Sequence, residues 1–171
     1  GAPLLLTLAL VLGTLGDVLL AQPRGPRLLV GLAAFLAGHL AYAALFIRIG
    51  DGFAMLTTVP WRGALAAILL LATLWTLRHL RPHLGAMTWP VTGYAIVSVI
   101  MGAAALTLPI GVGLGLAMTG AGLFILSDAI LGFDLFRPPA SERLQRFMAT
   151  QLWALYWVGQ ALILTGVLSA L

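Results

Sequence analysis

Six long apolar runs divide this chain, and they constrain its fold more than any other feature of the sequence. A helix needs about 20 predominantly apolar residues to cross the hydrocarbon core of a bilayer. Only 8% of the residues are charged, against roughly 25% in soluble domains. Because no water-soluble fold can bury so much apolar surface, the composition predicts a polytopic membrane protein. The runs lack the polar–apolar alternation of a membrane barrel, so we expect helices.

The predicted all-α bundle is a single transmembrane domain over residues 1–171. Its six spans are expected near residues 3–21, 28–47, 61–77, 89–108, 109–136 and 147–171. Gly111 and Gly115, four residues apart at the start of the fifth run, are typical of a helix-packing motif.

The placement of the arginines predicts the topology. All nine basic residues are arginines. Those after the first, third and fifth runs are Arg24, Arg27, Arg78, Arg81, Arg137, Arg143 and Arg146, and the opposite side has Arg48 and Arg62. The positive-inside rule places the arginine-rich loops in the cytoplasm and both ends of the chain outside. Abundant Ala, Leu, Gly, Arg and Pro suggest a bacterial source, and hence the bacterial inner membrane.

The composition also excludes several kinds of chemistry. There are no cysteines, so disulfides, thiolate metal sites and a cysteine nucleophile are excluded, and the absence of lysine excludes a lysine nucleophile. The net charge of +4 is explained by arginines at helix ends and does not argue for nucleic acid. We expect neither a cofactor nor a metal.

Asp17 and Asp128 lie inside apolar runs, each near the inner end of its helix. An ionised carboxylate in hydrocarbon is costly, so an acid there is a candidate functional residue. The negative end of the helix dipole, the low dielectric and a like-charged neighbour would each favour the protonated acid. A neutral carboxyl group can act as a general acid. The alternative is that the two aspartates reach the interface and pair with Arg24 or Arg137.

Other polar side chains fall at a similar depth in the inner half of the bilayer. His39 and Tyr94 are candidate catalytic residues, and the candidate substrate contacts are Tyr42, Ser98, Ser127, Tyr156 and Gln160. This asymmetry predicts one cavity that opens toward the inner leaflet. The alternatives are structural: a core histidine bonded to its own helix, serines bonded to their own backbone, and Tyr156 with Gln160 joining helices.

Several short motifs resemble the YhhN/TMEM86 family of lysoplasmalogenases. They are residues 16–20 (GDVLL), 31–42 (GLAAFLAGHLAY), 90–94 (PVTGY), 124–128 (FILSD) and the segment 156–160, in this order along nearly the whole chain. Family members usually have eight spans, and their first two spans include a Lys-Pro-Leu stretch. This sequence starts where the third family span would, so we expect either a piece of a longer chain or a shortened member.

The resemblance implies hydrolysis of the vinyl ether bond of a single-chain (lyso) phospholipid to a fatty aldehyde and a glycerophospho head group. The chemistry begins with proton transfer to the β-carbon, which an aspartic acid can supply, while a second, ionised aspartate stabilises the cation and activates water. Asp17 and Asp128 would take these roles in either order. His39 would orient a carboxyl group or relay a proton, and Tyr94 would position water or the ether oxygen.

Two other functions fit the same residues. Asp17, His39 and Asp128 could ligate zinc in a membrane lipid hydrolase, although no closely spaced ligand pair supports this. Intramembrane acids also occur in proton-coupled transporters, but the chain has no convincing internal repeat. Protein partners and oligomeric state have no signal in the sequence.

Overall fold

The computed structural model describes residues 1–21, 25–111 and 113–170. The helices are α1 (Ala2–Leu20), α2 (Pro26–Ile49), α3 (Met55–Thr58), α4 (Pro60–Leu84), the 3-10 turn η1 (Gly85–Met87), α5 (Thr88–Ala105), α6 (Leu114–Phe136) and α7 (Glu142–Leu168). No strand occurs in these ranges. The prediction of a helical membrane bundle is confirmed.

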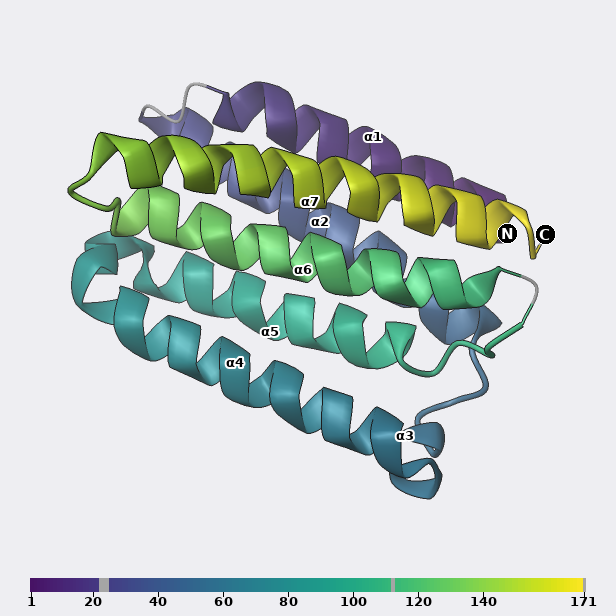
Figure 1. The fold of residues 1–171 in the computed structure, drawn as a ribbon. Coiled ribbons are helices and arrows are strands. Elements are labelled where there is room, and N and C mark those ends of the chain that lie inside the picture. Colours follow the sequence, from purple (N-terminus) through teal and green to yellow (C-terminus); the bar gives the residue numbers. More distant parts are fainter. Residues whose placement is uncertain (22–24, 112, 171) are drawn as a thin grey trace.

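The six predicted spans correspond to the six long helices of the described chain. Five helical stretches are long and apolar enough to cross a membrane, and one of them, Pro60–Ala105, comprises α4, η1 and α5 together. That stretch folds back on itself at Gly85, whose positive φ of 51° favours a residue without a side chain. Figure 1 shows α4 and α5 side by side and antiparallel as a result. The protein is an integral membrane protein.

Connections between the helices alternate between the two ends of the bundle (Figure 1). The end of α1, the start of α2, the α4–α5 turn and the α6–α7 connection lie together at one end, and the start of α1 and the end of α7 lie at the other. The arginine-rich loops therefore share one end of the bundle, as the sequence pattern requires. Arg24 lies outside the described residues.

Arg62 departs from the expectation of a helix-end anchor at the interface. Its side chain is buried, lies over the ring of Trp61 and donates from Nη1 to the carbonyl oxygen of Leu106 at 2.5 Å. The end of α5 is rich in unpaired carbonyl groups, which attract a cation. Arg62 therefore ties the start of α4 to the end of α5.

Close helix packing depends on glycines other than the predicted pair. A Cβ on Gly111 would meet nothing within 4 Å, and one on Gly115 would make a single ordinary contact at 3.9 Å. By contrast, a Cβ on Gly120 of α6 would lie 2.5 Å from the carbonyl oxygen of Gly159 on α7. The packing prediction for the first pair is wrong, because α7 meets this end of α6 at Gly113 and Ala117 instead: a Cβ on Gly166 would lie 2.8 Å from the Gly113 carbonyl oxygen and 2.5 Å from the Ala117 backbone nitrogen.

Candidate active site

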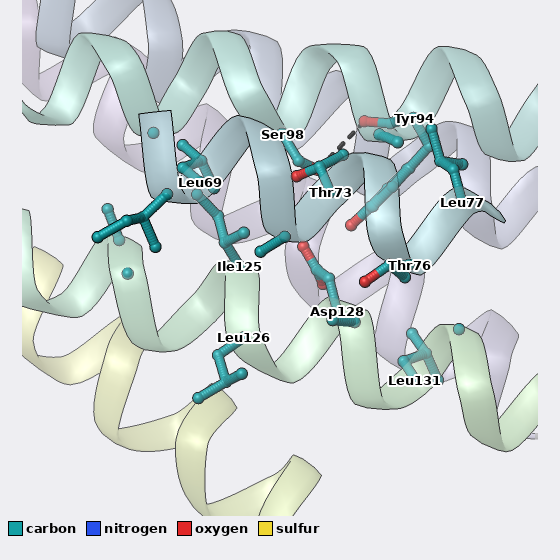
Figure 2. A pocket seen from close by; sticks show the side chains of 18 of the residues that line it. Leu69, Thr73, Thr76, Leu77, Tyr94, Ser98, Ile125, Leu126, Asp128 and Leu131 are labelled. Carbon is teal, nitrogen blue, oxygen red and sulfur yellow. Dashed lines mark hydrogen bonds between the residues drawn. The ribbon is translucent and has the colours of Figure 1, made fainter. Parts of the chain in front are cut away.

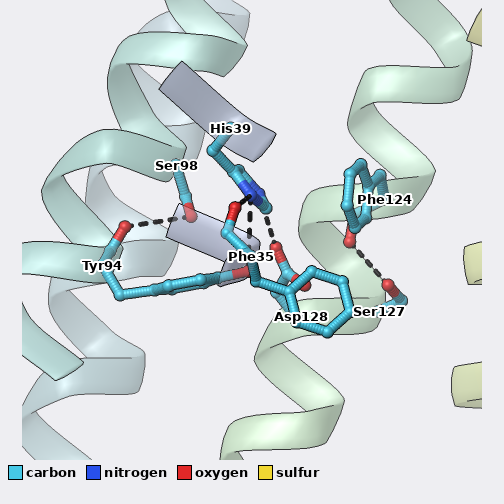
Figure 3. A network of polar contacts seen from close by, with 7 residues as sticks. All are labelled: Phe35, His39, Tyr94, Ser98, Phe124, Ser127 and Asp128. Carbon is cyan, nitrogen blue, oxygen red and sulfur yellow. Dashed lines mark hydrogen bonds and ion pairs between the residues drawn. The ribbon is translucent and has the colours of Figure 1, made fainter. Parts of the chain in front are cut away.

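Asp128 on α6 and His39 on α2 form a buried pair. Asp128 Oδ2 lies 2.8 Å from His39 Nε2, and the two side chains are 9% and 1% exposed. Neither atom has another hydrogen-bond partner among the described residues, so each satisfies the other. This contact, shown in Figure 3, joins segments that are far apart in the sequence.

The protonation of this pair follows from its second hydrogen bond. His39 Nδ1 lies 2.9 Å from the carbonyl oxygen of Phe35, and a carbonyl can only accept, so Nδ1 carries a hydrogen. One proton then lies between His39 Nε2 and Asp128 Oδ2. The pair is either an imidazolium facing a carboxylate or a neutral imidazole accepting from a carboxylic acid. In both forms the site stores a transferable proton and has no net charge.

Tyr94 on α5 completes this group of residues. Its hydroxyl group lies 3.5 Å from His39 Nδ1 and also interacts with the carboxyl group of Asp128. The rings of Tyr94 and His39 meet edge to face with centroids 5.0 Å apart. Because Nδ1 already carries its hydrogen, the tyrosine hydroxyl is free to donate toward the carboxyl group. We call Asp128, His39 and Tyr94 the acid cluster.

The acid cluster borders a large cavity between α4, α5 and α6. The cavity has a volume of about 490 Å³, and Tyr94 and Asp128 line it, whereas His39 lies behind them. Figure 2 shows Thr73, Thr76, Tyr94, Ser98 and Asp128 gathered in one part of it. Apart from Thr119, the rest of the lining is apolar or glycine. Such a space suits an alkyl chain with one polar region along its length.

The mouth of the cavity lies on the outer surface of the bundle. Three lining residues on α4 and α6 are also well exposed, namely Leu65 at 43%, Ile68 at 60% and Leu126 at 51%. These helices are membrane-spanning, so their exposed apolar side chains contact lipid. The mouth therefore opens sideways to hydrocarbon.

Asp17 on α1 belongs to a second polar group, formed by residues of α1, α2 and α7. Its Oδ2 accepts a hydrogen bond of 2.7 Å from the hydroxyl of Tyr156 on α7. Nearby, the hydroxyl of buried Tyr42 donates to Gln160 Oε1. None of these four residues lines the cavity.

The two aspartates thus lie in neighbouring but separate groups. The ring of Phe124 contacts both, with centroids 4.8 Å from His39 and 5.4 Å from Tyr156. In the described part of the chain, no hydrogen bond or ion pair joins Asp17 to Asp128. The expectation that both carboxyl groups face one cavity is therefore not met, because aromatic packing between α2, α6 and α7 keeps them apart.

The sequence alternatives can also be compared with these contacts. Asp128 pairs with His39 and not with Arg137. Ser98 donates to the carbonyl of Tyr94 at 3.1 Å, and Ser127 to that of Phe124 at 2.7 Å, as serines in helices often do. Ser98 still lines the cavity, whereas Ser127 does not.

Thr73 and Thr76 of α4 are cavity residues that the sequence reasoning missed. None of the candidate residues named from the sequence lies in the third run. The signal was present, because two threonines three residues apart share one helical face.

The model of the YhhN family matches residues 1–167 of the chain. The chain belongs to the YhhN family. The predicted resemblance is thereby confirmed. Human lysoplasmalogenase TMEM86B is 33% identical over 159 residues, which make up 91% of this chain and 59% of that protein. The chain thus spans less than two thirds of this curated relative. No solved structure matches the chain.

Proposed function

We propose that this protein is a lysoplasmalogenase-like hydrolase that cleaves the vinyl ether bond of a single-chain phospholipid. The observation that carries this proposal is the 2.8 Å contact between Asp128 Oδ2 and His39 Nε2 beside an apolar cavity that Asp128 lines and that opens to lipid. The name of the human relative supports the same reaction class.

The reaction starts when Asp128, as the carboxylic acid, donates its proton to the β-carbon of the vinyl ether. The carbon–carbon double bond is consumed, and the adjacent carbon becomes an oxocarbenium ion. The carboxylate that remains faces this cation and stabilises it. His39, with Nδ1 fixed on the Phe35 carbonyl, keeps Nε2 directed at Asp128 Oδ2 and so orients the carboxyl group.

Water completes the reaction. It adds to the oxocarbenium carbon and gives up a proton to Asp128, so the acid is regenerated. The resulting hemiacetal collapses to a fatty aldehyde and the free glycerophospho alcohol. Tyr94 and the threonines Thr73 and Thr76 are the hydroxyl groups that line this part of the cavity and can hold the water or the ether oxygen.

Asp17 has a different part in this proposal from the one the sequence suggested. It lies away from the cavity, where its carboxyl group accepts from Tyr156. We assign it to holding α1 against α7, beside the Tyr42–Gln160 hydrogen bond that joins α2 to α7. A substrate role for Tyr42, Ser127, Tyr156 and Gln160 has no support from the cavity lining.

The orientation of the lipid follows from the positions of the arginines. At the arginine-rich end the cavity is lined by Leu80 and Phe136, and Arg81 and Arg137 follow these residues directly in the sequence. A phosphate group would lie near these cations, and the alkyl chain would extend toward the other end. If that end is cytoplasmic, the enzyme takes its substrate from the inner leaflet of a bacterial inner membrane.

The test is mass spectrometry of the products formed by the purified protein from a vinyl ether lysophospholipid and from its saturated alkyl ether analogue. We expect aldehyde from the first and no cleavage of the second, since protonation of the double bond is the catalysed step. Equal cleavage of both, or of neither, would contradict the proposal.

The two other candidate functions have less support. Asp17, His39 and Asp128 do not converge, and no three acidic or histidine residues in the described ranges are placed to share a metal ion. Loss of activity with a strong chelator would revive the zinc hypothesis. Proton-dependent uptake of the lipid into vesicles without aldehyde formation would favour a transporter.

A further inference from the structure

The apolar part of the cavity has a narrow point at Gly102. A Cβ atom on this glycine would lie 2.9 Å from Cδ1 of Ile125 on α6, and still closer to Cδ2 of Leu69 on α4. All three residues line the cavity, and Figure 2 shows Leu69 and Ile125 reaching into it from their helices. Because residue 102 has no side chain, the ends of Leu69 and Ile125 lie against the α5 backbone, and an added methyl group would push them into the cavity. We call these three residues the neck.

The neck lies a short way from the acid cluster, on the side away from the arginines. Gly102 follows Ser98 by four residues on α5, and Leu69 precedes Thr73 by four on α4, which is one helical turn or about 6 Å in each case. Beyond the neck, Leu65, Leu106 and Met118 continue the apolar lining.

This geometry matches the length of an ordinary lipid chain. From Ser98 to Leu106 the cavity wall follows α5 for about 12 Å, close to the roughly 15 Å that the chains of one leaflet span. A long chain with its reactive bond at Asp128 that lies along this wall passes the neck, whereas a short chain ends before it.

We propose that the neck selects substrates by chain length, with Gly102 as the residue that determines specificity. The head group and the ether linkage of the substrate rest on the proposed function, whereas selection by chain length acts on any single alkyl chain. Narrowing the neck excludes long chains while leaving short ones bound. Widening it has the opposite effect.

The experiment uses saturated alkyl lysophospholipids with octyl, dodecyl and octadecyl chains, bound to the full chain in lipid nanodiscs. We expect Gly102→Ala to weaken binding of the octadecyl lipid relative to the octyl lipid by about tenfold, the effect of excluding roughly two methylene groups from apolar burial. Leu69→Ala alone should shift the preference toward longer chains. The double variant should restore the wild-type preference, because the new methyl group then has space.

Gly122→Ala is the matched control, since Gly122 also lines the cavity but a Cβ there meets nothing within 4 Å. It should leave the chain-length preference unchanged. An unchanged chain-length preference in both Gly102→Ala and Leu69→Ala would overturn the proposal. If the Gly102→Ala protein does not fold, the result for Leu69→Ala decides alone. A shifted binding preference in a protein that releases no aldehyde would reject the proposed function and support the neck.

Discussion

His39 Nε2 lies 2.8 Å from Asp128 Oδ2, and no other partner is available to either atom among the residues described. Each of these two atoms is therefore satisfied only by the other. A carboxyl group and an imidazole held in this way at the edge of an apolar cavity can give up a proton to a substrate and take one back from water, and the carboxylate that exists in between faces the cation formed on the substrate.

Replacing Asp128 with Asn should abolish most of the vinyl ether cleavage. The amide keeps the shape of the side chain but cannot donate a carboxylic proton, and general acid catalysis contributes about 10²–10⁴-fold to rate. Aldehyde release measured under saturating lipid gives the effect. Near-normal turnover by a folded Asp128→Asn protein would remove Asp128 from the mechanism.

Replacing His39 with Ala should lower stability as well as rate. It leaves the carboxyl group of Asp128 buried without a partner, and breaking a buried pair from one side costs roughly 3–5 kcal/mol. Thermal unfolding in detergent measures the loss. His39→Gln, which can still hydrogen-bond to Asp128, is the control and should recover part of the stability but not the rate.

Tyr94→Phe should slow cleavage while leaving the fold intact. The ring that packs against His39 is kept, and only the hydroxyl group near Asp128 is lost. A hydrogen bond to a charged group contributes roughly 1.5–3 kcal/mol, so we expect the rate of cleavage to fall about 10–100-fold. Ser98→Ala, on the same helix face but bonded to its own backbone, should have little effect by comparison.

Asp17→Ala should lower the stability of the fold and should affect the rate of cleavage less directly. Its loss removes the acceptor of the Tyr156 hydroxyl, at a cost of ~1–3 kcal/mol. Tyr156→Phe removes the same hydrogen bond from the other side and should produce a similar loss in thermal unfolding. If Asp17→Ala keeps its stability but loses all activity, Asp17 belongs to the catalytic machinery after all.

Gly120→Val should prevent α6 from packing against α7. The backbone carbonyl of Gly159 occupies the space that the new side chain needs, and a carbonyl cannot turn aside as a side-chain end can. We expect aggregation or loss of the folded protein in size-exclusion chromatography. Gly115→Ala, where the added Cβ makes only an ordinary contact, should behave like the wild type.

The sequence by itself determined the helical membrane fold and the alternation of the arginine-rich loops, and it named His39, Tyr94 and Asp128 as candidate catalytic residues. These features depend on composition and on periodicity within one helix, which the residues encode directly. The same periodicity places Asp17 near the inner end of α1 but does not say which helix its side chain meets.

The tertiary structure decided which polar groups meet. Asp17 and Tyr156 are 139 residues apart, and their contact depends on how α1 and α7 pack, as does the separation of Asp17 from Asp128. Helices in a membrane are brought together by shape complementarity and small residues, because lipid supplies no hydrophobic force between them. Such complementarity is a property of two surfaces at once. For that reason the cavity beside Asp128, the threonines of α4 and the neck at Gly102 became visible only in three dimensions.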